Sequence, residues 1–306
     1  MPSPRVALGP SPSPFAAHAV NEGGGEVVTL GEPADALVWL SAHDTDGLRE
    51  ALEMRPEIRW VQLPFAGVER FAETGLLGDG RLWTCAKGAY APEVAEHGLA
   101  LALAGLRRLP ERARARSWGR PAGTTLRDQE IVIIGAGGIA VELMALLAPF
   151  RVKATVVRHH PVPFPGAART VATDELHSVL AGATVVWLAL ALTPATTGII
   201  GPPELALMGP RAWLVNVARG GHVQTDALVA ALRAGDIGGA ALDVTDPEPL
   251  PDGHPLWDLP NCLVTPHTAD WPEVTEAPLA RRISTNVRRF ADREPLDGIV
   301  DPEKGY

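Results

Sequence analysis

The sequence predicts an α/β protein of two domains, the larger of them built on a doubly wound parallel sheet. Three observations support this fold class. Short apolar runs alternate with helical stretches along most of the 306 residues. In the second half these runs are almost continuously apolar, as in strands that helices cover on both faces. One of the runs leads into a glycine-rich turn and then a helix, a combination typical of nucleotide-binding units.

The first ninety or so residues predict a small parallel sheet. Pro10, Pro12 and Pro14 follow the first apolar run, so we expect a connecting loop there rather than a helix. Pro92 begins a long helical pattern that ends at Pro110. The candidate strands are RVAL (5–8), ALVWL (36–40), IRWVQL (58–63) and LWTCA (82–86).

From Ile131 onward the pattern predicts the larger sheet. Pro272 begins a last helix, which we expect to break at Pro278 before the chain returns to the first domain. The predicted first domain is therefore 1–94, completed by 279–306, and the second is 95–278. The candidate strands are IVIIG (131–135), KATVV (153–157), TVVWLAL (184–190), AWLVNV (212–217), GGAALDV (238–244) and CLVTP (262–266).

Composition excludes several classes of partner. A net charge of −9 disfavours nucleic acid and acidic membranes. The one basic cluster, 107–120, is interrupted by acidic and apolar residues and is expected to be a solvated helix face or a subunit contact. Cys85 and Cys262 lack metal-ligand spacing, which argues against a disulfide framework and a metal site. No run approaches the ~18 apolar residues of a membrane span, so we expect a cytoplasmic protein.

The segment EIVIIGAGGIAVELM carries the pattern G-x-G-x-x-A between a strand and a helix. Gly135 permits the tight turn, Gly137 lets the backbone approach a pyrophosphate, and Ala140 permits close packing of the helix on the strand. The amino terminus of the helix adds hydrogen-bond donors and a favourable dipole. The second domain is therefore predicted to be a Rossmann-type dinucleotide-binding domain.

The next strand ends with Arg158, followed by His159 and His160, where an NAD-binding protein usually has an acidic residue. An arginine can bind the 2′-phosphate of NADP through two hydrogen bonds. We therefore expect NADP(H) to be favoured, with NAD(H) possible.

Polar residues follow three downstream strands: Arg219, then Asp243 and Glu248, then His267. Open α/β sheets bind ligands at these strand ends. Together with GAGGIA, the segments VNVARGG, ALDVTDPEPLP and PLWDLPNCLVTPHTA resemble the D-isomer-specific 2-hydroxyacid dehydrogenases, especially their glyoxylate and hydroxypyruvate reductase branch. The strong resemblance covers roughly 93–269; the amino-terminal region matches more loosely, through QLPFAGVER and CAKGAYAPEVAEHGLALAL.

The chemistry of this family suits these residue types. Reduction of a 2-keto acid requires a hydride, a proton and a held carboxylate. Arg219 fits the carboxylate clamp, His267 the proton donor, and Glu248 the partner that favours the charged imidazole. By analogy with the family, Asp243 would hold the nicotinamide carboxamide. The other residues assigned to the cofactor are Gly138, Ile139, Leu190 and Val217.

The resemblance also assigns roles outside this set. In the family, the loop matching Ala66, Gly67 and Val68 presents backbone N–H groups to the substrate carboxylate, and the substrate domain is flavodoxin-like. The segment containing Trp118 wraps a partner subunit in this branch, so a homodimer is expected. Trp271 could line the substrate pocket or pack against a helix start.

Two other functions remain open at this point. A dinucleotide-sensing, corepressor-like binding protein would keep much the same residues without turnover. A dehydrogenase for a bulkier or phosphorylated 2-hydroxy acid would keep the same catalytic residues with a different pocket. Sequence alone fixes neither the acid nor the physiological direction.

Overall fold

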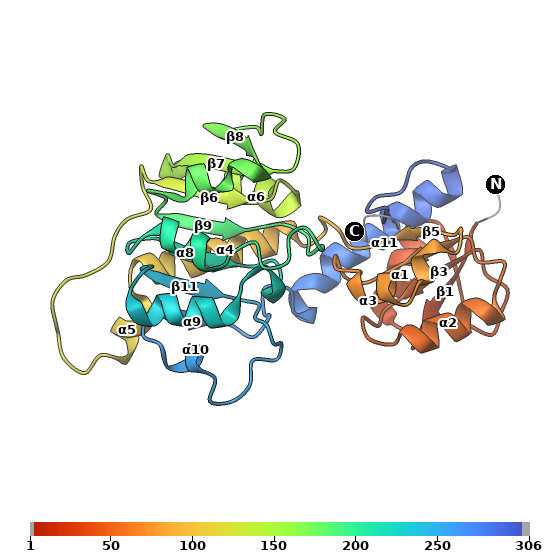
Figure 1. The fold of residues 1–306 in the computed structure, drawn as a ribbon. Coiled ribbons are helices and arrows are strands. Elements are labelled where there is room, and N and C mark those ends of the chain that lie inside the picture. Colours follow the sequence, from red (N-terminus) through yellow and green to blue (C-terminus); the bar gives the residue numbers. More distant parts are fainter. Residues whose placement is uncertain (1–2, 302–306) are drawn as a thin grey trace. The chain divides into compact units, whose positions relative to one another are not determined.

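The structure, a computed structural model, describes residues 3–301, which divide into two compact units (Figure 1). The first consists of 3–90 and 271–301, and the second of 91–270. Helices α4 (Ala91–Leu106) and α11 (Pro272–Asp292) begin at or next to these divisions. The predicted boundaries at 94 and 278 fall inside the same two helices. Within the described residues, no helix is both long and apolar enough to cross a membrane.

The first unit is built on a parallel sheet of five strands in the order β2-β1-β3-β4-β5. This is the flavodoxin-type order, as predicted. β2 was not among the predicted strands, because a three-residue edge strand leaves little apolar pattern. The strands are β1 (Arg5–Gly9), β2 (Glu26–Val28), β3 (Ala36–Trp39), β4 (Trp60–Gln62) and β5 (Leu82–Thr84). Its helices besides α11 are α1 (Pro14–Glu22), α2 (Thr45–Met54), α3 (Glu69–Glu73) and the 3₁₀ turn η1 (Leu76–Gly78).

Two proline predictions in this unit were wrong. Pro14 does not belong to a loop but begins α1, where Ser13 caps the helix. Proline suits the first turn because its missing N–H would have no helical partner there. Pro278 does not break α11, which continues to Asp292. Burial of an apolar stripe that includes Leu279 and Ile283 offsets the one helical hydrogen bond that Pro278 removes.

A buried polar cluster fastens α11 to the sheet of the first unit. Asn286 Nδ2 donates to Gln62 Oε1 at 2.9 Å, and Thr84 Oγ1 donates to the same oxygen at 2.9 Å. Asn286 Oδ1 accepts from the backbone N–H of Asp297 at 2.8 Å. Gln62, Thr84 and Asn286 are fully buried, so these groups depend on one another for hydrogen bonding.

The second unit is built on a parallel sheet of seven strands in the order β12-β11-β10-β9-β6-β7-β8. From β8 to β11 this is the doubly wound dinucleotide-binding order, which confirms the predicted fold class. The strands are β6 (Glu130–Ile134), β7 (Lys153–Arg158), β8 (Arg169–Ala172), β9 (Val185–Leu188), β10 (Trp213–Asn216), β11 (Gly239–Leu242) and β12 (Cys262–Val264).

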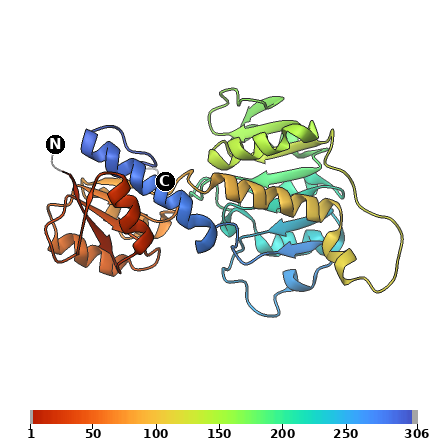
Figure 2. The ribbon, with the colours of Figure 1, turned by 180° about the vertical axis from the view of Figure 1, so that it is seen from behind.

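Helices cover both faces of this sheet. α4 and α6 pack side by side on one face (Figure 2), and α8 and α9 lie on the other (Figure 1). Close packing of α4 depends on Gly105, where a Cβ atom would lie 2.3 Å from the Trp213 ring. The helices are α5 (Leu109–Arg114), α6 (Gly138–Leu147), α7 (Leu176–Leu180), α8 (Pro202–Met208), α9 (Thr225–Ala234) and α10 (Pro255–Asp258), with 3₁₀ turns η2 (Ala148–Phe150), η3 (Thr173–Glu175) and η4 (Gly220–His222).

All seven strands run in the same direction, so their carboxyl ends meet at one edge. That edge positions the candidate site. A long loop leads from α5 to β6 (Figure 1) and carries Trp118, whose surface is 96% exposed.

Replacing Asn286 by alanine should lower the free energy of unfolding by about 2–3 kcal/mol, because buried donors and acceptors would lose their partners. Urea unfolding followed by tryptophan fluorescence would measure this change. The matched control is Arg288→Ala on the exposed face of the same helix, which should change stability by less than about 0.5 kcal/mol. Equal stability of the two variants would show that the cluster contributes nothing.

Candidate active site

The glycine-rich turn after β6 has the backbone that a dinucleotide site requires. Gly135 adopts φ +114°, and a Cβ atom there would lie 2.1 Å from the carbonyl oxygen of Ala189. Only glycine fits this position. Ala140 is fully buried where α6 packs on the sheet, as its small size permits.

The start of α6 fits a bound pyrophosphate. Gly137 is the N-cap residue, no side chain caps the helix, and a Cβ atom at Gly137 would meet nothing within 4 Å. Gly137 and Gly138 are exposed and Ile139 is half-buried. The first N–H groups of a helix have no partner inside it, so those that follow Gly137 remain available to an anion.

Arg158 ends β7, the strand next to the glycine-rich turn. Gly135 N donates to Val157 O at 2.8 Å, which holds the turn beside the end of this strand. Arg158 is half-buried, and the exposed rings of His159 and His160 stack edge to face with centroids 4.4 Å apart. The side chains of Arg158, His159 and His160 can all donate hydrogen bonds to an anion. Among the described residues no carboxylate pairs with Arg158.

Leu190 and Val217 lie just beyond the next two strands of the same edge. Leu190 follows β9, and its carbonyl oxygen contacts His222 Nε2 at 3.3 Å. Val217 follows β10 and is 7% exposed, packed near Gly98 of α4. Both positions border the edge on which the glycine-rich turn lies.

Arg219 lies in a tightly held turn after β10. Asn216 Nδ2 donates to Arg219 O at 2.9 Å, and Arg219 Nη1 donates to Ala218 O at 2.8 Å. A Cβ atom at Gly220 would lie 1.9 Å from Thr245 O, so this turn and the loop after β11 are in direct contact.

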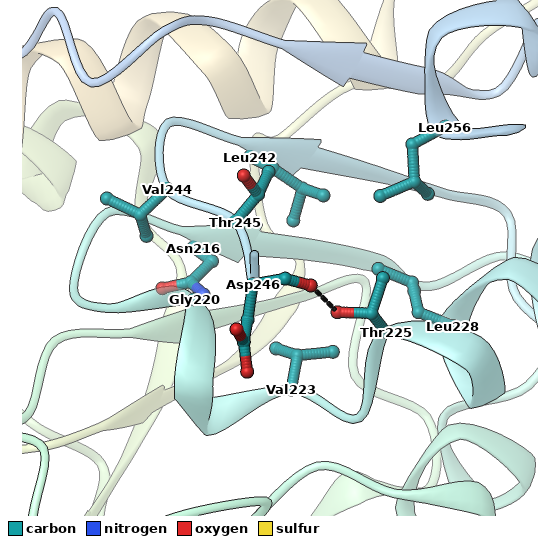
Figure 3. A pocket seen from close by; sticks show the side chains of 10 residues that line it. All are labelled: Asn216, Gly220, Val223, Thr225, Leu228, Leu242, Val244, Thr245, Asp246 and Leu256. Carbon is teal, nitrogen blue, oxygen red and sulfur yellow. Dashed lines mark hydrogen bonds between the residues drawn. The ribbon is translucent and has the colours of Figure 1, made fainter. Parts of the chain in front are cut away.

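Behind these loops lies a cavity of about 10 Å³, room for at most one water molecule (Figure 3). Thr225 Oγ1 donates to Asp246 O at 2.5 Å across it. It is a packing gap rather than a substrate pocket.

The buried carboxylate of Asp243 accepts hydrogen bonds from the loop that carries His267. Its Oδ1 accepts from Thr265 Oγ1 at 2.6 Å and from Thr268 N at 3.0 Å, and its Oδ2 accepts from Ala269 N at 3.1 Å. His97 Nε2 of α4 lies 3.2 Å from Oδ1. Burial opposes ionisation, but the hydrogen bonds from His97 and the loop outweigh it and lower the pKa of Asp243 to about 2.

His267 and Glu248 form a close pair in this loop region. His267 Nδ1 lies 2.6 Å from Glu248 Oε1, and Glu248 Oε2 accepts weakly from Thr245 N at 3.4 Å. His267 has φ +52°, a conformation uncommon outside glycine, and its backbone N–H donates to Asp243 O at 2.8 Å. The backbone therefore holds the imidazole in place against its local preference.

Charge in the pair is coupled. The hydrogen bond that His267 Nδ1 donates to Glu248, aided by the negative charges of Glu248 and Asp270, raises the pKa of His267 in spite of its burial. The same hydrogen bond lowers the pKa of Glu248. Near neutral pH the pair therefore favours an imidazolium beside a carboxylate.

The second unit thus brings together Arg219, Asp243, Glu248 and His267 beyond the strands β10 to β12, on the edge that also carries the glycine-rich turn. The predicted anion loop belongs to the first unit. There Ala66 is exposed, Val68 is 1% exposed, and Cys85 Sγ donates to Ala66 O at 3.6 Å.

Sequence reasoning missed three residues of this region. His97 was assigned no role, yet it pairs with Asp243; Thr265 donates to the same carboxylate. Asp270 Oδ1 lies 3.8 Å from His267 Nε2. The role of Asp270 could have been suspected from its position three residues after the histidine. The contact between His97 and Asp243 joins residues far apart in the sequence, and no local pattern predicts it.

Comparison with known proteins agrees with this geometry. An uncharacterized protein encoded in the proB 3′ region of Corynebacterium melassecola is 40% identical over 295 residues, covering 94% of this chain and 95% of that protein. Glyoxylate/hydroxypyruvate reductase A of Serratia proteamaculans is 30% identical, covering 90% and 88%. A D-isomer specific 2-hydroxyacid dehydrogenase of Xanthobacter autotrophicus, solved with NADPH and MES, is 27% identical with a TM-score of 0.84, covering 99% and 100%.

Residues 98–269 match the family described as D-isomer specific 2-hydroxyacid dehydrogenase, NAD binding domain. The match spans the glycine-rich turn, Arg219 and the Glu248–His267 pair. The chain therefore belongs to the D-isomer specific 2-hydroxyacid dehydrogenase family of NAD(P)-dependent enzymes.

Proposed function

We propose that this enzyme reduces a small 2-keto acid of the glyoxylate or hydroxypyruvate type to the D-2-hydroxy acid, with NADPH as the preferred reductant. The observation that carries the proposal is the 2.6 Å contact between His267 Nδ1 and Glu248, which leaves Nε2 for the substrate. Support for the substrate class comes from the reductase of Serratia proteamaculans at 30% identity. Support for NADPH comes from Arg158 and from the Xanthobacter autotrophicus enzyme.

In this proposal the substrate is held by its carboxylate. Arg219 pairs with it through the planar guanidinium fork. A role of the backbone N–H groups of Ala66, Gly67 and Val68 in binding a substrate carboxylate stays a prediction from the family resemblance. Fixing the carboxylate orients the keto group toward His267.

Reduction needs one hydride at the keto carbon and one proton at its oxygen. A nicotinamide coenzyme, when bound, would supply the hydride. His267 gives the proton from Nε2 to the forming alkoxide, and Glu248 stabilises the imidazolium before transfer. The neutral histidine then takes a proton from solvent, which restores the starting state.

The chain's own residues would hold the coenzyme as follows. Gly135, Gly137, Gly138 and Ile139 receive the pyrophosphate at the start of α6. Arg158 and His159 receive the 2′-phosphate. Leu190 and Val217 would border the nicotinamide end, and Asp243 Oδ2, which accepts from Ala269 N, would have capacity for a carboxamide N–H.

Other inferences from sequence stay predictions. These are the homodimer, with Trp118 near the partner subunit, and the cytoplasmic location. The sensor alternative is less favoured, since the chain belongs to a family of enzymes. The substrate panel below tests a bulkier 2-hydroxy acid, and a phosphorylated 2-hydroxy acid stays an alternative.

Initial rates of NADPH oxidation with glyoxylate, hydroxypyruvate, pyruvate and bulkier 2-keto acids test the proposal. We expect turnover of the small acids, and a fall in kcat of about 10²–10⁴-fold in His267→Ala through loss of the proton donor. The control His18→Ala removes an exposed histidine of α1 and should retain wild-type rates. Binding of NADPH without turnover of any acid would contradict the proposal and favour the sensor function.

The pH dependence of reduction should report the His267 pair. The reactive form carries the proton, and the pKa of His267 is raised, so kcat/KM should stay high above pH ~6.5, the ordinary histidine value, and fall only as pH passes the raised pKa. In Glu248→Gln this midpoint should move to lower pH, because the main cause of the shift is removed. A profile with the same midpoint in both enzymes would argue against the coupling.

Arg158→Ala should raise KM for NADPH by about tenfold or more and change KM for NADH much less, because only NADPH carries the 2′-phosphate. The control is Lys153→Ala, at the opposite end of the same strand. Equal effects on both coenzymes would remove the phosphate-binding role of Arg158 while leaving the chemistry intact.

A further inference from the structure

A second carboxylate lies beside the catalytic imidazole. Asp270 Oδ1 is 3.8 Å from His267 Nε2, the ring nitrogen opposite the one that Glu248 occupies. The distance is too long for a hydrogen bond, so Asp270 leaves Nε2 of His267 available to donate its proton to a substrate. Its side chain is only 21% exposed.

The carboxylate of Asp270 has unused accepting capacity. Within residues 3–301, no hydrogen bond joins its side-chain oxygens to another residue. Burial raises the pKa of Asp270, whereas the positive charges of His267 and Arg219 favour its ionised form. An acceptor of this kind beside the reacting position is suited to a donor on the substrate.

The groups around the imidazole already include more carboxylates than cations before a substrate arrives. Arg219 and protonated His267 are positive, whereas Glu248, Asp270 and the neighbouring Asp243 are carboxylates. The substrate carboxylate adds a further negative charge to this site. A second anionic group on the substrate would meet Asp270 without any further compensating cation in this set, which is unfavourable in a partly buried site.

We propose that Asp270 is a specificity-determining residue, which selects 2-keto acids that carry a hydrogen-bond donor on C3 over those with an apolar or anionic group there. The inference rests on the proposed function, because it takes the keto oxygen to lie at His267 Nε2. With the keto oxygen at His267 Nε2 and the substrate carboxylate paired with Arg219, the C3 substituent is the remaining group of the substrate, and the proposal takes it to face Asp270. A C3 hydroxyl donates to Asp270, a methyl leaves the carboxylate unpaired, and a carboxylate is repelled.

Three substrates of related size separate these effects: hydroxypyruvate, pyruvate and oxaloacetate. The measured quantities are ratios of kcat/KM within one enzyme preparation, from which the fraction of active protein cancels. The variants are Asp270→Asn, which removes the charge but keeps an accepting oxygen, and Asp270→Ala, which removes both. Asp236→Asn, an exposed residue just before β11, is the control for net charge.

The wild type should prefer hydroxypyruvate over pyruvate and disfavour oxaloacetate. In Asp270→Ala the hydroxypyruvate to pyruvate ratio should fall about tenfold, by loss of the hydrogen bond to a charged acceptor. In Asp270→Asn the oxaloacetate to pyruvate ratio should rise about tenfold, while part of the preference for hydroxypyruvate remains. The control should keep the wild-type ratios.

Ratios within about twofold of wild type in both Asp270 variants, with all rates lowered alike, would overturn the inference and leave the proposed function standing. A wild type that reduces hydroxypyruvate no better than pyruvate would overturn it as well. A wild type that reduces no 2-keto acid at all would overturn the proposed function and this inference together.

Discussion

The geometry of the candidate active site depends on one buried carboxylate, that of Asp243. Five groups converge on it or on its backbone: the Thr265 hydroxyl, the Thr268 and Ala269 amides, the His97 ring and the His267 amide. They come from α4 and from the loop after β12. Because Asp243 is 2% exposed, the loss of a partner would leave a buried polar group without a hydrogen bond, which is costly. The loop is therefore fastened to the end of β11.

That fastening explains the unusual backbone of His267. A histidine at positive φ is held by its surroundings rather than by local preference. The held backbone directs Nδ1 to Glu248 at 2.6 Å, and the resulting charge coupling favours the protonated ring. The position and the protonation of the His267 ring thus have the same structural cause. Both depend on loops that meet because the parallel strands end at one edge of the sheet.

Much of this arrangement could be predicted from local pattern. The order of apolar runs and the G-x-G-x-x-A turn predicted the fold class, since each strand and turn carries its own signal. Pairing of Glu248 with His267 followed from family resemblance and from the chemistry of a proton donor. The predicted helix break at Pro278 was wrong. Helix propensity disfavours proline inside a helix, but burial of the apolar face of α11 stabilises the continuous helix. The edge strands β2 and β8 were missed because their short runs carry little pattern.

Contacts between distant segments could not be predicted. No pattern near His97 in the sequence predicts its contact with Asp243, because only the fold brings α4 to the end of β11. The direction of the Asp270 side chain likewise follows from the backbone of the histidine loop, which the motif does not reveal.

The most direct test of this account is an NMR titration of the His267 ring in the wild type and in Glu248→Gln. We predict a His267 pKa above histidine's ordinary value of about 6.5 in the wild type, and a clearly lower pKa in the variant. A wild-type pKa at or below the ordinary value, or one that the substitution leaves unchanged, would contradict the claim that Glu248 holds His267 ready as the proton donor.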